Sequence, residues 1–203
     1  RWYLTGHAPW SNGYEAIVFI SWVSVLAGLL LYKNRNAFIP TTGAMVAVIM
    51  MGFAHGSSML DPQITPLVPV LKSYWLIVHV AIIVSSYGFF GLSAVLAFFS
   101  LIIMMIKPNK KIEISLKEMT YVAEMSLTIG IYLLTVGTFL GGMWANESWG
   151  RYWSWDPKET WAFVSVIVYA VVLHMRLVPG LRGKFAFNVA ALWAVWTVIM
   201  TYF

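Results

Sequence analysis

Long runs of apolar residues recur along this 203-residue chain. A helix rises about 1.5 Å per residue, so about 20 mostly apolar residues are enough to cross the hydrocarbon core of a membrane. The chain is 60% hydrophobic and only 10% charged, which leaves too few polar side chains to cover a water-soluble core. The sequence therefore predicts an all-α, polytopic membrane bundle of about six helices. The apolar stretches span residues 15–32, 39–53, 75–106, 121–144, 157–175 and 185–203.

Lysine and arginine alternate between the two ends of the predicted helices, as a single membrane orientation requires. Basic residues are retained in cytoplasmic loops, so the side that carries more of them is predicted to be cytoplasmic. The net charge of +5 then follows from topology, without any nucleic-acid partner. The more basic side holds Lys33, Arg35, Lys107, Lys110, Lys111, Lys117, Arg176, Arg182 and Lys184, and the other side holds Arg1, Lys72, Arg151 and Lys158.

Two local patterns indicate structure rather than chemistry. The segment around Leu116, in which Glu113 and Lys117 are four residues apart, predicts a short amphipathic stretch at the cytoplasmic surface. Small residues such as Gly88, Gly137 and Gly141 are expected to let neighbouring helices approach closely. Cysteine is absent, which excludes disulfides and thiolate metal sites within the chain.

Tryptophan is concentrated in residues 144–161, which we call the tryptophan run. Such a segment forms either an aromatic belt at the membrane surface or a binding surface for a large planar ligand with anionic edges, such as a porphyrin with two propionates. Arg151 and Lys158 are the cations available to such a ligand, and Trp149 and Trp153 would share a face only if the stretch were helical. The tryptophans are Trp144, Trp149, Trp153, Trp155 and Trp161.

Residues 156–159 have the pattern of a helix start. Asp156 is predicted to be the N-cap, Pro157 the first helical residue and Glu159 the partner of a capping box. On this interpretation the two carboxylates stabilise the helix. The alternative is that Asp156 belongs to the ligand-binding surface of the tryptophan run.

Histidines occur at two depths in the predicted bundle, where an ionisable side chain suggests function. His79 lies near the start of the third stretch, at the same side as the tryptophan run, and is a candidate iron ligand. His174 lies near the opposite side, so the two cannot share a ligand. His7 and His55 are weaker candidates for a second axial ligand. The alternative for each is a structural histidine.

Together these motifs resemble the WWD domain of haem-handling proteins in cytochrome c maturation. The pattern Trp-Gly-x-x-Trp-x-Trp-Asp at residues 149–156 carries the resemblance. Residues 6–15, 75–79, 157–161 and 173–176 are similar to its CcsA (ResC) branch, the system II cytochrome c synthase, which also occurs fused to its partner as CcsBA. The likeness implies one membrane-embedded domain over residues 1–203, within a longer chain, with residues 144–161 as its external haem-binding segment.

The resemblance also implies an activity. Such a protein receives haem b near the cytoplasmic side, moves it outward and presents its vinyl groups to the Cys-x-x-Cys-His motif of an apocytochrome c. In the family, one histidine before the WWD domain ligates the outer haem and one in the following span ligates haem within the membrane; these correspond to His79 and His174. No catalytic acid or base is evident, so we expect positioning to drive attachment.

The implied partners are a ResB (CcsB) protein or fused segment, the apocytochrome and thiol-reducing thioredoxin-like proteins, and synthase activity is expected only with the ResB part. The implied location is the bacterial inner membrane with the tryptophan run in the periplasm, or else a thylakoid membrane. Two other functions remain open. One is a haem exporter or chaperone that serves a different attaching protein, and the other is a quinone-binding structural subunit of a respiratory complex.

Overall fold

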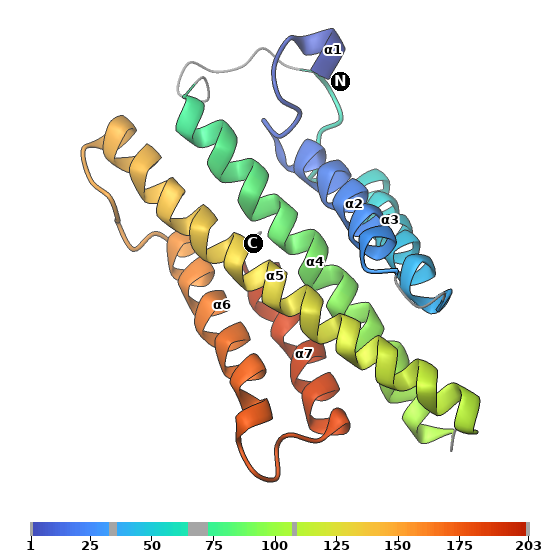
Figure 1. Cartoon of the computed structure of the whole chain (residues 1–203). Helices are drawn as coiled ribbons and strands as arrows, with labels where there is room; N and C mark the ends of the chain where they lie inside the picture. The colour runs from blue at the N-terminus through green and yellow to red at the C-terminus, as the bar shows by residue number, and fades with distance from the viewer. Residues whose placement is uncertain (1, 33–35, 65–72, 107–108, 202–203) are drawn as a thin grey trace.

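A computed structural model describes residues 2–32, 36–64, 73–106 and 109–201, and within these residues it contains helices and no strand. Figure 1 shows α4 and α5 as a long pair through the middle of the molecule, with α2 and α3 on one side and α6 and α7 on the other. The helices are α1 (Trp2–Thr5), α2 (Gly13–Leu30), α3 (Phe38–Gly56), α4 (Tyr74–Met105), α5 (Lys110–Trp149), α6 (Pro157–His174), the 3-10 helix η2 (Met175–Leu177) and α7 (Lys184–Ile199).

The predicted membrane bundle is confirmed. Helices α2 to α6 are long and apolar enough to cross a membrane, and α7 is apolar but has only 16 residues. Helix α4 has 32 residues and α5 has 40. At about 1.5 Å per residue both are longer than the roughly 30 Å of a bilayer core, so they tilt or project beyond it.

Helix α5 begins earlier than the sequence pattern predicts. The amphipathic stretch expected beside the fourth span is continuous with it, because the side chain of Asn109 caps the helix by accepting from the amide of Ile112 at 3.0 Å. Leu116 is buried, while Glu113 and Lys117 form an exposed 3.8 Å ion pair, which accounts for the amphipathic pattern. The helix therefore starts at Lys110, eleven residues before the apolar stretch that begins at Tyr121.

The predicted role of the small residues in helix packing is also confirmed. A Cβ atom added to Gly88 of α4 would lie 2.7 Å from Cγ1 of Val23 in α2. One added to Gly137 of α5 would lie 2.5 Å from Cγ1 of Ile83 in α4. Both distances are shorter than van der Waals contact, so only glycine allows these helices to pack so closely.

A stacked aromatic pair joins α4 to α6 in the core. The rings of Phe90 and Tyr169 are 3.8 Å apart between centroids and inclined by 5°, and both side chains are fully buried. Aromatic pairs contribute stability beyond the area they bury, so this contact helps to hold α6 against α4.

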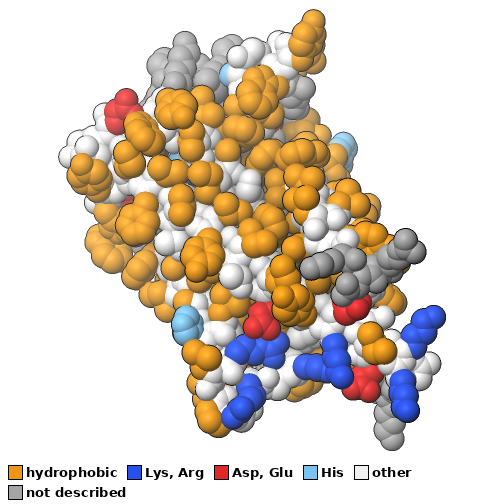
Figure 2. Space-filling model, in the orientation of Figure 1, with side chains coloured by type: hydrophobic (Ala, Val, Ile, Leu, Met, Phe, Trp, Pro, Cys, Tyr) orange, Lys and Arg blue, Asp and Glu red, His pale blue; other side chains and the backbone are white. Residues whose placement is uncertain are grey.

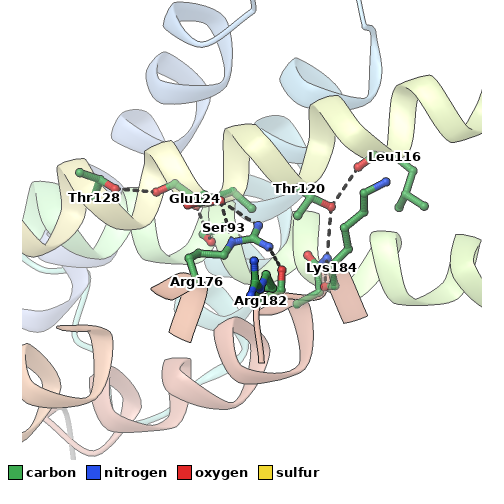
Figure 3. A network of polar contacts seen from close by, with 10 residues as sticks. Ser93, Leu116, Thr120, Glu124, Thr128, Arg176, Arg182 and Lys184 are labelled. Carbon is green, nitrogen blue, oxygen red and sulfur yellow. Dashed lines mark hydrogen bonds and ion pairs between the residues drawn. The ribbon is translucent and has the colours of Figure 1, made fainter. Parts of the chain in front are cut away.

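Basic residues gather at one end of the molecule, below an apolar band (Figure 2). Arg176 lies at this end and donates to the carboxylate of Glu124 in α5 from Nε at 3.0 Å and Nη2 at 2.8 Å (Figure 3). Its Nη1 donates to the carbonyl of Arg182 at 2.9 Å, so Arg176 ties α5 to the turn between α6 and α7. Arg1, Lys33, Arg35, Lys72 and Lys107, which also entered the charge pattern, lie outside the described residues.

Candidate functional site

The tryptophan run lies at the other end of the molecule, where α5 ends and the chain returns to α6 (Figure 1). Gly150 ends α5 in the left-handed conformation, with φ of +69°. Trp149 is therefore the last helical residue, and Trp153 lies in the loop rather than on the same helical face. The loop folds back along α5, since a Cβ added to Gly142 would lie 3.2 Å from the carbonyl oxygen of Tyr152.

The tryptophans form two groups. Trp144 and Trp149 of α5 meet edge to face, with centroids 6.4 Å apart. Trp153 and Trp155 meet edge to face at 5.7 Å, and both contact Phe163 of α6, at 6.5 and 6.4 Å. Phe163 was not predicted as a site residue, because it lies in an ordinary apolar span with no local signal. The observed arrangement therefore links the loop tryptophans to α6.

Parts of these side chains are available to a ligand. Trp149 and Trp155 are 61% and 68% exposed. The indole nitrogens of Trp144 and Trp153 are buried and have no hydrogen-bond partner among the described residues. Unpaired buried N–H groups are unusual, so both indoles are candidate donors to something bound here. Trp161, in the first turns of α6, is partly buried.

The helix start at residues 156–159 is confirmed, with one difference. Asp156 caps α6 by accepting from the amide of Glu159 at 2.8 Å. The Glu159 carboxylate does not complete a capping box; it accepts from the amide of Ser154 at 2.7 Å and from its hydroxyl at 3.1 Å. Both carboxylates thus hold the loop, while Arg151 and Lys158 are exposed and form no ion pair with any described residue.

His79 points from α4 to α5. Its Nδ1–H donates to the carbonyl oxygen of Gly137 at 2.7 Å, and the ring is partly buried. Six residues before His79, at the N-cap of α4, the hydroxyl of Ser73 donates to the carboxylate of Glu147 at 3.0 Å. These contacts fix the start of α4 against the part of α5 that leads into the tryptophan run. The sequence placed His79 at this end of the molecule but gave no sign of Gly137 or Glu147 as partners.

His174 ends α6, two residues before Arg176, so it lies at the basic end of the molecule and far from the tryptophan run. Seventeen residues separate it from Pro157, which corresponds to about 26 Å of helix. Its ring is exposed, and Nδ1 donates to the carbonyl of Ala170 at 2.7 Å. The two histidines are thus at opposite ends of the bundle, as the sequence predicted.

His7 and His55 make contacts that differ from those of His79. His7 lines a small cavity of about 80 Å³ with Trp10 and the α4 residues Leu76 and Val80, whereas His79 faces α5. His55 is exposed at the end of α3, with its ring edge-on to Tyr14 at 6.0 Å. Whether either is an axial ligand stays a prediction.

Comparison with known proteins decides the family. The model of the family described as cytochrome c assembly protein matches residues 10–203. The chain belongs to this family. Membership in this family relates the chain to the assembly of cytochromes c.

Several relatives support the CcsA-type assignment. The chain is 44% identical to Protein NrfI of Wolinella succinogenes over all of its own length, which is 22% of that protein. It is 33% identical to the cytochrome c biogenesis protein CcsA of Prochlorococcus marinus, covering 91% of the chain and 68% of the relative. The CcsA of Mesostigma viride is 35% identical, with 91% and 70% covered. The chain spans about a fifth of the length of NrfI and two thirds of the CcsA proteins.

The site contains the groups that a haem cargo needs in a cytochrome c assembly protein. The exposed indole faces suit a flat ring, and the exposed Arg151 and Lys158, which pair with no described carboxylate, suit its anionic propionates. Among the described residues, no cluster of three or more His, Cys, Asp or Glu side chains is arranged to hold a metal ion. A haem iron needs only one protein side chain on each face of the ring, so His79 stays a candidate axial ligand on its position alone.

The two roles considered for Asp156 can be separated by substitution. Asp156→Ala is expected to destabilise the start of α6 by about 1 kcal/mol, since the cap is lost. Asp156→Asn retains a side-chain oxygen that can accept from Glu159 and is expected to cost only a few tenths of that. Thermal unfolding of the purified protein in detergent measures both. An equal loss in the two variants would mean that the charge of the carboxylate matters and that Asp156 is more than a cap.

Proposed function

We propose that this protein carries haem b across the membrane and presents it at the tryptophan run for covalent attachment to the Cys-x-x-Cys-His motif of an apocytochrome c. The observation that carries the proposal is the position of the two histidines. His79 is beside the helix that leads into the tryptophan run, and His174 is among the basic residues at the other end. In both rings a carbonyl accepts from Nδ1, which leaves Nε2 to coordinate iron.

At the outer site, His79 is the proposed axial ligand, and the tryptophan run is the proposed binding surface for the porphyrin. The exposed faces of Trp149 and Trp155 would stack on the ring, while Arg151 and Lys158 would pair with the propionates. Each cysteine thiol then adds across a vinyl double bond, with sulfur bonding to one carbon and the proton to the other. This addition is redox-neutral, so the protein contributes mainly position.

At the opposite end, His174 is the proposed ligand where haem enters. The basic residues there support a cytoplasmic assignment by the positive-inside rule. The tryptophan run, residues 144–161, would then be the external haem-binding segment of a single membrane domain, facing the periplasm of a bacterial inner membrane. A ResB (CcsB) protein or segment and thiol-reducing thioredoxin-like proteins are the proposed partners.

A reporter cytochrome tests the proposal. The full-length protein and its ResB partner are expressed with a small Cys-x-x-Cys-His reporter in a bacterium without its own cytochrome c maturation genes. We expect covalent haem on the reporter, detected after denaturing electrophoresis, and a reduction of at least tenfold when Trp153 and Trp155 are both changed to alanine. A reporter without haem, from a protein that itself carries haem, would instead identify a haem exporter or chaperone and contradict attachment.

A further inference from the structure

We propose that Gly141 and the backbone carbonyl of Gly137 are positioning groups for His79, which hold its imidazole in one tautomer and one orientation for haem iron. This inference rests on the proposed function, because it concerns the same outer site. It adds two groups on α5 that neither the WWD pattern nor the histidine itself identifies.

The first observation is the hydrogen bond between helices. All four histidines direct Nδ1 to a backbone carbonyl, but His7, His55 and His174 use one within four residues of their own position. His79 alone reaches another helix, at Gly137, with a distance of 2.7 Å. A carbonyl oxygen only accepts, so the hydrogen must be on Nδ1 and the lone pair on Nε2. The bond therefore selects the tautomer that binds iron through Nε2.

The second observation is the lack of space above Gly141. A Cβ atom at this position would lie 2.5 Å from Cε1, 2.8 Å from Nδ1 and 3.1 Å from Nε2 of His79. Three ring atoms within this range mean that the imidazole lies directly against the glycine backbone. Any other residue at position 141 would push the ring away and break its bond to Gly137.

The third observation is the register of the α4–α5 pair. Three glycines of α5 each face one side chain of α4: Gly130 faces Phe90, Gly137 faces Ile83 and Gly141 faces His79. The intervals between successive contacts are seven and four residues on both helices. The two helices therefore pack in constant antiparallel register along this length. The hydrogen bond from Ser73 to Glu147 extends the register toward the tryptophan run. This rigid pairing fixes the height of His79 along α5.

The consequence is that one helix controls both parts of the outer site. Gly141 is three residues before Trp144, so the position of the iron ligand and the start of the stacking surface are set by the same stretch of α5. A carbonyl bonded to the far nitrogen of a ligating imidazole also makes the ligand more basic and tunes the iron. Gly137 and Gly141 would thus influence both haem affinity and reduction potential.

A pair of matched substitutions separates positioning from packing. Gly141→Ala and Gly130→Ala add the same methyl group to the same interface, each 2.5 Å from a ring carbon, of His79 in one case and Phe90 in the other. In the full-length protein, Gly141→Ala is expected to lower the amount of bound haem that depends on His79 at least tenfold, or to shift the reduction potential and spectrum of this haem. Gly130→Ala should leave the spectrum and potential of the retained haem unchanged. Equal effects in the two variants would overturn the proposal in favour of general packing.

A chemical test does not depend on how the glycine variants fold. In His79→Gly, imidazole can occupy the vacated space and donate to Gly137, whereas 1-methylimidazole can bind iron but has no N–H left to donate. We expect that about tenfold more 1-methylimidazole than imidazole is needed for the same recovery of the haem spectrum, as one lost hydrogen bond predicts. This ratio is first corrected by the ratio of the two compounds measured on free haem in the same detergent. Recovery should fail with either compound in the double variant His79→Gly, Gly141→Ala.

The outcomes distinguish two kinds of failure. If the wild-type protein holds no haem, or His79→Gly leaves its haem unchanged, the proposed function itself fails at this site and the positioning role with it. If His79→Gly removes haem but the two imidazoles recover it equally after correction, the outer site stands and the positioning role of Gly137 is overturned.

Discussion

His79→Gly and His174→Gly are each expected to remove a different haem population from the purified full-length protein. His79 lies beside α5 near the tryptophan run, and His174 lies at the basic end, about 26 Å of helix from the start of α6. An iron atom that loses its axial ligand is held only by contacts to the porphyrin. We therefore expect about half of the bound haem to be lost in each variant. Reporter maturation should fall at least tenfold in both, because losing a ligand has a larger effect than losing a residue that hydrogen-bonds to the ligand, which typically costs about 10–100-fold.

Added imidazole is the control for each substitution, because it replaces the missing ligand without restoring any other contact. Absorption spectra of the reduced protein, recorded with and without imidazole, should show separate recovery in the two variants. Haem loss that is identical in spectrum for both variants would mean one shared site, which contradicts haem binding at two ends of the bundle. The same spectra of His7→Gly and His55→Gly test the prediction that one of these residues supplies a second ligand.

Phe90→Ala is expected to cause the largest loss of stability. The ring is fully buried, stacks on Tyr169 at 3.8 Å and packs against Gly130, so its removal leaves a cavity where α4, α5 and α6 meet. Replacing a buried phenylalanine with alanine costs about 3 kcal/mol or more. Helices in a membrane associate mainly through such packing, so we expect a clear decrease in the thermal unfolding temperature in detergent.

Phe98→Ala is the matched control on the same helix. Phe98 is 45% exposed on the apolar surface, so the same truncation there removes contacts with lipid or detergent rather than with other helices. Its unfolding temperature should stay close to that of the wild type. Similar losses for Phe90→Ala and Phe98→Ala would contradict the stacked pair as the link between α4 and α6.

The spans and the helix start at Asp156 were predictable because each depends on neighbouring residues. Hydropathy accumulates along a single stretch, and a cap such as Asp156 bonds to an amide only three residues away. The continuity of the amphipathic stretch with the fourth span was not predicted, because the charged first turns from Lys110 do not resemble part of a membrane span.

The partners of the candidate site residues were not predictable for a different reason. Gly137 as the acceptor for His79, and Phe163 as the contact of Trp153, depend on the register in which two helices pack. An apolar stretch is hydrophobic all round in a membrane, so its periodicity does not say which face meets which neighbour. The candidate site residues could be chosen from the sequence, but their arrangement relative to one another follows only from how the helices pack in the folded bundle.

The most direct test of haem binding is a haem assay, together with the absorption spectrum of the chemically reduced protein, on the wild-type full-length protein purified from haem-replete cells. We predict bound haem whose spectrum indicates histidine ligation, at a level that falls when Trp153 and Trp155 are replaced by alanine. A protein that contains no haem under these conditions, and contains quinone instead, would contradict the account and indicate that the tryptophan run serves a different ligand.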